Sequence, residues 1–132
     1  MASQPTPCAN LKVAEFNSFI RGYHAYKDIW IPVPGEVLIL KREPTNVQDK
    51  SAVAIYNEGD VVGHVPYNIS SLLSNFLKRE CNKGFVEVTG SCVNRGAGYG
   101  LEVPCIYRLY GPQPYIERIQ EIVQSLLDKG LL

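Results

Sequence analysis

The sequence lacks paired metal ligands. Its four cysteines are far apart and form no C-x-x-C pair, and its two histidines are isolated. This spacing argues against a structural zinc site, and no metal or other cofactor is expected. Cys92 and Cys105 lie in β-like runs and are predicted to be buried thiols, as in a reducing compartment; two disulfides are the alternative for a chain outside the cell.

Long apolar runs are also missing. None approaches the roughly 18–20 residues of a membrane-spanning helix, so no membrane partner is expected. The first seven residues have neither the charge nor the apolar core of a secretion signal, and residues 1–12 are expected to form a flexible lead-in. We therefore expect an intracellular protein. At 132 residues, the chain is expected to hold one domain, over residues 13–132.

Charge of one sign is not in excess, because 13 Lys and Arg residues are balanced by 13 Asp and Glu residues. Proteins that bind nucleic acid mainly through its phosphates usually carry a basic excess. A nucleic-acid function would therefore have to depend on local charge and on specific contacts to a strand end.

Motifs of catalysis are absent as well. The chain has no G-x-S-x-G, no Walker loop and no H-E-x-x-H. Gly96, Gly98 and Gly100 suggest a phosphate cradle, but they lie between two predicted strands and not before a helix. We interpret them as a hairpin tip, and we do not expect an enzyme.

Short apolar runs separated by turn formers are what the sequence does contain. They predict six strands, near residues 16–25, 36–40, 51–56, 61–65, 85–93 and 101–110. Asn68 is expected to cap an inserted helix of about three turns, and an apolar stripe predicts a C-terminal helix over 113–129. Short antiparallel strands with frequent turns favour a mainly β (α+β) fold, a small barrel with two helices.

The most informative segment is REPTNVQDKSAV at residues 42–53, between two predicted strands. Pro44 should end the first strand, because a proline restricts its own backbone and that of the residue before it. Thr45, Asn46 and Asp49 are turn formers, so the connection is predicted to be tight and rich in hydrogen-bonding groups. It is either a rigid platform for recognition or a turn whose side chains only cap backbone groups.

This segment resembles the signature of the HIRAN domain, and further motifs match in the same order. They are G-Y-H-A-Y at 22–26, G-E-V-L-I-L at 35–40, V-V-G-H-V-P at 61–66 and L-E-V-P at 101–104. The resemblance covers residues 18–111. It implies an OB-like six-stranded small barrel with one inserted helix and one C-terminal helix. The chain is similar to HIRAN domains of the helicase-like transcription factor type, which bind the free 3′ end of single-stranded DNA.

The resemblance also implies a DNA-binding site. Asn46 and Asp49 would contact the terminal nucleotide and its hydroxyl, with Tyr26 and His64 beside it. A carboxylate can accept a terminal O–H and would repel a phosphate in the same place. Basic residues of the signature segment would lie near the phosphates of the strand, namely Arg42 and Lys50.

Several positions of this site differ from that DNA-binding type. His24 and Ala25 stand where it has an arginine and a first tyrosine. Thr45 replaces an asparagine, Tyr67 a lysine and Leu101 a phenylalanine. The chain thereby loses two phosphate partners and two stacking groups, the latter worth about 1–3 kcal/mol each. The alternative function is a protein–protein interaction module on the same barrel, with weak or lost DNA binding.

Some side-chain directions stay open at the level of sequence. Tyr23 or Tyr26 points inward if both lie on a strand, and His64 either meets a ligand or bonds a carbonyl inside the barrel. Trp30 is interpreted as a lid over the core. The resemblance further implies helicase or nuclease modules of a longer parent protein as partners, and a nuclear location if the chain binds DNA.

Overall fold

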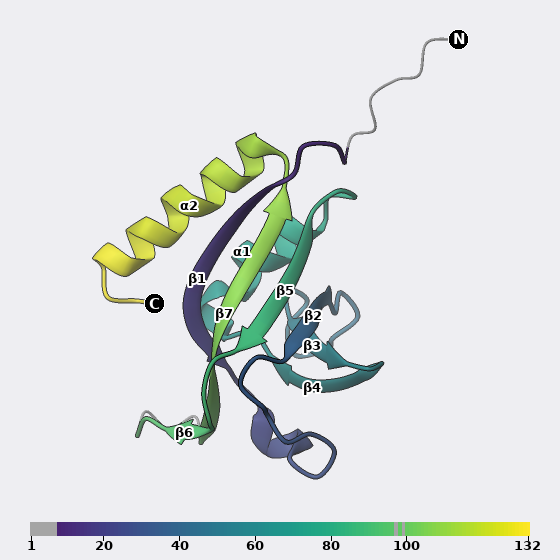
Figure 1. Cartoon of the computed structure of the whole chain (residues 1–132), viewed down its shortest axis with the longest axis vertical. Coiled ribbons are helices and arrows are strands. Elements are labelled where there is room, and N and C mark those ends of the chain that lie inside the picture. Colours follow the sequence, from purple (N-terminus) through teal and green to yellow (C-terminus); the bar gives the residue numbers. More distant parts are fainter. Residues whose placement is uncertain (1–7, 97, 99) are drawn as a thin grey trace.

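The computed structural model describes residues 8–96, 98 and 100–132, and for His24 the backbone alone. These residues form seven antiparallel strands, two α-helices and one 3-10 helix (Figure 1). In chain order the elements are β1 (Lys12–Ile20), the 3-10 helix η1 (Tyr23–Tyr26), β2 (Val37–Arg42), β3 (Val53–Asn57), β4 (Asp60–His64), α1 (Tyr67–Leu77), β5 (Lys83–Val88), β6 (Val93–Asn94), β7 (Leu101–Gly111) and α2 (Gln113–Asp128).

The sheet runs in the order β1-β7-β5-β2-β3-β4, and the short β6 pairs with the beginning of β7. Figure 1 shows β1, β7 and β5 side by side, with α2 along the outside of β1 and the fainter α1 behind the sheet. The fold is thus mainly β with two helices, as predicted. The closed six-stranded barrel is not confirmed, because the structure has seven strands in an open sheet.

The two edges of this open sheet nevertheless touch at one bridge. Arg21 N donates to His64 O at 2.9 Å, and His64 N donates to Arg21 O at 2.8 Å. Gly63 makes the approach possible, since a Cβ at this position would lie 2.5 Å from Ile20 Cγ2 and 3.0 Å from Arg21 O. The bridge brings the end of β1 next to the end of β4.

The first predicted strand, at 16–25, is corrected by the structure. β1 covers Lys12–Ile20, and Gly22 then adopts a left-handed conformation with φ of 75°, which turns the chain into η1. Glycine has no Cβ to oppose this conformation. Strand alternation therefore does not orient Tyr23 and Tyr26. Tyr23 is buried against Trp30, with ring centroids 5.9 Å apart, and both residues belong to the core.

Three further expectations are wrong in detail. Asn68 does not cap α1, which follows Pro66, and its Nδ2 instead donates to Leu131 O at 2.7 Å. The strand expected over 85–93 is divided, because β5 ends at Val88 and Val93 already belongs to β6. The C-terminal helix, expected over 113–129, ends one residue earlier, at Asp128.

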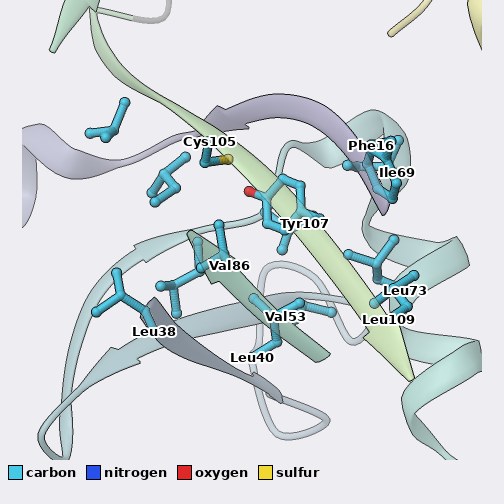
Figure 2. Close-up of a cluster of buried hydrophobic side chains, with 14 of the residues drawn as sticks. Phe16, Leu38, Leu40, Val53, Ile69, Leu73, Val86, Cys105, Tyr107 and Leu109 are labelled. Carbon is cyan, nitrogen blue, oxygen red and sulfur yellow. The ribbon is translucent and has the colours of Figure 1, made fainter. Parts of the chain in front are cut away.

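The core is formed by side chains of the strands and of both helices, and Figure 2 shows Tyr107 of β7 surrounded by side chains of other strands and of α1. The hydroxyl of Tyr107 donates to Phe19 O at 2.7 Å, and burial raises the pKa of this phenol well above 10.0. Burial likewise raises the pKa of the Cys105 thiol to about 12. Cys92 is a half-buried free thiol, so only one of the two thiols expected inside is fully buried.

The N-terminal segment is tied to the fold by a disulfide between Cys8 and Cys81. Most of the lead-in expected at 1–12 falls on residues 1–7, which lie outside the described residues. Strand β1 begins at Lys12, which is the last residue of the expected lead-in. Nowhere in the described residues is there a helix long and apolar enough to cross a bilayer.

Candidate functional site

The connection between β2 and β3, residues 43–52, is held by its own short side chains. Asn46 Oδ1 accepts hydrogen bonds from Gln48 N at 2.9 Å and from Asp49 N at 3.1 Å. Asp49 Oδ1 accepts one from Ser51 N at 2.9 Å. Side-chain oxygens in this role replace backbone acceptors and fix the loop. The tight polar turn predicted from the sequence is therefore present, and we call it the signature loop.

The signature loop is joined to the bridge between the sheet edges by Glu43. Its Oε1 lies 2.7 Å from His64 Nε2 and 3.3 Å from Asn46 Nδ2. A carboxylate can only accept, so His64 Nε2 carries the proton and donates it. His64 thus bonds a carboxylate at the rim of the sheet and not a carbonyl inside a barrel. Glu43 sets the position of both His64 and Asn46.

Tyr26, at the end of η1, lies next to this pair. Its ring is tilted against His64, with centroids 6.3 Å apart, and is half-buried. Burial, the Glu43 carboxylate and Tyr56 raise the pKa of Tyr26, so the phenol keeps its proton at neutral pH. The structure therefore places Tyr26 and His64 side by side.

A hollow of about 360 Å³ opens beside the signature loop, and we call it the loop groove. Its size falls in the about 300–1,000 Å³ range of small-molecule sites. It has acidic, basic and aromatic walls. The residues that line it are Arg21, Asn46, Gln48, Asp49, Ala52, Val53, His64, Val65 and Tyr67.

Arg21 supplies the basic wall of the loop groove. Its Nε donates to Glu102 Oε2 at 3.1 Å, and the same carboxylate accepts from Arg95 Nε at 2.9 Å and Arg95 Nη2 at 3.0 Å. Burial alone would raise the pKa of Glu102, but the hydrogen bonds and charges of the two arginines lower it below 4.5. Glu102 is therefore ionised at neutral pH.

The structure brings four of the predicted site residues into the loop groove: Asn46, Asp49, His64 and Tyr67. Thr45 and Lys50 are exposed on the signature loop, next to the groove but not in its lining. With 78% of its surface exposed, Tyr67 presents an aromatic face at the rim.

The other predicted residues lie elsewhere. Arg42 points toward α1, where its Nε donates to Ser74 Oγ at 3.2 Å. Leu101 is exposed at the start of β7, opposite Asn94 of β6. The side chain of His24 lies outside the described residues.

Sequence reasoning missed Arg21, Gln48 and the linking role of Glu43. From the sequence, His24 stands where HIRAN domains of the DNA-binding type have an arginine. The structure supplies an arginine to the loop groove from a position three residues earlier, Arg21. A signal was present, because Arg21 is the first polar residue after Phe19 and Ile20 and stands directly before Gly22. Among the described residues, no three His, Cys, Asp or Glu side chains are grouped to hold a metal ion.

Solved structures with a similar fold include two of an HLTF HIRAN domain. The crystal structure of the HIRAN domain of human HLTF is 18% identical, covers 87% of this chain and 91% of its own, and has a TM-score of 0.68. The NMR structure of the HLTF HIRAN domain is 17% identical, covers 90% of this chain and 93% of its own, and also has a TM-score of 0.68. These likenesses establish the fold.

A crystal structure of a protein from Lactobacillus plantarum is 16% identical, covers 76% of this chain and 98% of its own, and has a TM-score of 0.52. No curated protein sequence matches the chain. The family model of the HIRAN domain, in contrast, matches residues 14–105, well over half of the chain. The match includes most of β1, the signature loop, the bridge at His64 and the first part of β7. The chain belongs to the HIRAN domain family.

Proposed function

We propose that this chain is a non-catalytic module that binds single-stranded DNA and holds its free 3′-hydroxyl end in the loop groove. HIRAN domains are DNA-binding modules, and the groove combines groups suited to a strand end. Asp49 can accept a hydroxyl, Tyr67 can stack a base, and Arg21 can meet a phosphate. The observation that carries the proposal is that the Asp49 carboxylate lines an open hollow although it also orders its own loop.

The terminal hydroxyl is assigned to Asp49. Its Oδ1 accepts the bond from Ser51 N, which fixes the carboxylate in one orientation, and its Oδ2 is the oxygen available to a ligand. A terminal phosphate would meet this negative charge and be repelled, so the site should discriminate between the two kinds of end. Asn46 holds the loop backbone in place beneath it.

The remaining contacts follow from the rim of the groove. Tyr67 exposes its ring on the outer side, where the terminal base can stack on it. Tyr26 and His64 lie across Glu43 from Asn46, and they flank the terminal nucleotide from that side. Lys50 is exposed on the signature loop and can reach the strand's phosphates as a flexible cation.

The experiment is a fluorescence anisotropy titration with short oligonucleotides labelled at the 5′ end, so that the 3′ end stays free. The 3′-hydroxyl form should bind about tenfold more tightly than the 3′-phosphate form, which corresponds to about 1.4 kcal/mol. Asp49→Asn should remove this preference, because the amide keeps an acceptor for Ser51 N but has no charge. Equal affinity of the wild-type protein for both forms would contradict end recognition.

Asp60→Asn is the matched control for that variant. Asp60 is an exposed aspartate at the start of β4, directly after the turn that joins β3 and β4, so the same change of charge occurs outside the groove. It should leave the preference for the hydroxyl end unchanged. A loss of preference in both variants would mean that net charge, and not the position of Asp49, selects the end.

The second candidate function is a protein-interaction module without DNA binding. It is favoured by the formal net charge of zero and by the loop before β2, which exposes Ile29, Ile31 and Val33. This loop is held in shape, because Glu36 accepts hydrogen bonds from Trp30 Nε1 at 3.2 Å and from Val33 N at 2.8 Å. Such a module would give no anisotropy change with either oligonucleotide.

A further inference from the structure

Glu102 is a charged side chain that the proposed DNA contacts do not use, although it is buried. It is 1% exposed and lies on β7 between two neighbours, β1 on one side and β6 on the other. A buried carboxylate is costly unless it is paired and hydrogen-bonded. Glu102 meets this condition with one arginine from each neighbour, Arg21 after β1 and Arg95 after β6.

The geometry of Arg95 is fixed from two directions. Its Nε and Nη2 form a two-pronged contact with Glu102, and its guanidinium lies over the ring of Phe19, 3.6 Å from the centroid. A guanidinium held by a carboxylate and an aromatic ring loses much of the freedom of a surface arginine. Nevertheless, 42% of the Arg95 side chain is exposed to solvent. The cation is thus ordered and accessible at the same time.

The position of Arg95 relative to the loop groove follows from the shared carboxylate. Arg21 lines the groove, and both Arg21 Nε and Arg95 Nη2 bond the same oxygen, Glu102 Oε2. The two guanidinium groups therefore stand next to each other, one in the groove and one just outside it. With two positive charges and one negative charge, the cluster carries a local positive charge in a chain that is neutral as a whole.

We propose that Glu102 is a positioning residue that holds Arg21 and Arg95 as a paired phosphate contact, and that the DNA strand leaving the loop groove passes over Arg95. The inference rests on the proposed function, since it concerns the same bound strand. It adds a second phosphate site away from the terminal nucleotide. The end itself is still read by Asp49.

The first test compares Arg95→Gln with Arg118→Gln. Arg118 is exposed on α2 with an exposed partner, Glu121, so both variants lose one charge but only the first touches the cluster. Arg95→Gln should weaken binding of the 3′-hydroxyl oligonucleotide about tenfold and reduce the slope of log Kd against log salt by about 0.7. The preference for the hydroxyl end should remain. Arg118→Gln should change neither quantity.

The second test uses Glu102→Gln, because a net-charge effect and a positioning effect would change its affinity for DNA in opposite directions. If charge alone mattered, removal of this negative charge would tighten DNA binding. The proposal expects weaker binding, because the amide has one oxygen and cannot bond both arginines as the carboxylate does. Circular dichroism and a thermal melt establish that the variant is folded at the temperature of the titration.

Arg95→Lys is a milder variant that keeps the charge but loses the planar fork. It should keep most of the salt slope of the wild-type protein and still bind less tightly. The inference is overturned if Arg95→Gln behaves like Arg118→Gln, or if Glu102→Gln binds single-stranded DNA more tightly than the wild-type protein. Either outcome leaves the proposed function standing. A wild-type protein that binds no single-stranded DNA overturns both.

Discussion

The signature loop and the Glu102 cluster border the same groove but are built in different ways. In the loop, Asn46 and Asp49 bond backbone groups two or three residues away. In the cluster, Arg21 and Glu102 are separated by 81 positions and meet because β1 pairs with β7. One wall of the groove is therefore set by local sequence, and the other depends on the register of the sheet.

This difference has consequences for stability. A loop whose bonds are local can lose one of them while the sheet stays intact, as in other surface connections. A buried carboxylate that connects β7 to the residues after β1 and β6 cannot be removed so easily, because its arginine partners then lose their counter-charge. The two walls should therefore respond very differently to single substitutions.

The largest expected effect is that of Glu102→Ala. We expect the free energy of unfolding to fall by about 2–3 kcal/mol, less than the about 3–5 kcal/mol of a fully buried pair, because both arginines reach solvent. Urea denaturation measures the change. Glu87→Ala is the matched control, since Glu87 also pairs with an arginine of the sheet, Arg108, but is more exposed, and its loss should be much smaller. Equal losses would contradict the special role of burial.

Asn46→Ala should have the next largest effect. The substitution removes the acceptor of Gln48 N and Asp49 N, and we expect a loss of about 1–2 kcal/mol. Hydrogen exchange should show faster exchange of these two amides while the strands keep their protection. Asn17→Ala, at an exposed position of β1, is the control and should leave the melt unchanged. Unchanged exchange in Asn46→Ala would show that the loop is not held by this side chain.

The stability of the cluster should depend on pH in a smaller but specific way. The pKa of Glu102 is lowered in the folded state from its ordinary 4.5, so its contribution is fully present above pH 4.5. It should be lost as the pH falls through the lower, folded value. Urea titrations at a series of acidic pH values should therefore show a steeper fall for the wild-type protein than for Glu102→Gln. Parallel curves would mean that other carboxylates dominate the acid transition.

Tyr67→Ala should have the smallest effect on stability, within about 0.5 kcal/mol, because the side chain is exposed. Its effect on binding should be larger, a loss of about 1–3 kcal/mol for single-stranded DNA if a base stacks on the ring. Tyr115→Ala on α2 is the control, with its ring against Arg79 and away from the groove. Unchanged affinity in Tyr67→Ala would remove this residue from the proposed interface.

Those parts of the fold that have local causes could be predicted from the sequence. The tight loop after Pro44 and the apolar stripe of α2 both have short-range signals in the sequence. The end of β1 was misplaced, because the choice between a strand and η1 at Tyr23 depends on the conformation of Gly22 and on burial against Trp30. Tertiary packing decided between two locally acceptable conformations.

By itself, the sequence determined the signature loop and the presence of Asn46 and Asp49 in it, since a proline and short polar side chains restrict the backbone over a few residues. Only the tertiary structure decided that Arg21 forms part of the same groove and that Glu102 joins it to Arg95. Contacts across 81 residues depend on which strands pair and in which register. Burial of the apolar faces fixes that register, and no short segment encodes it.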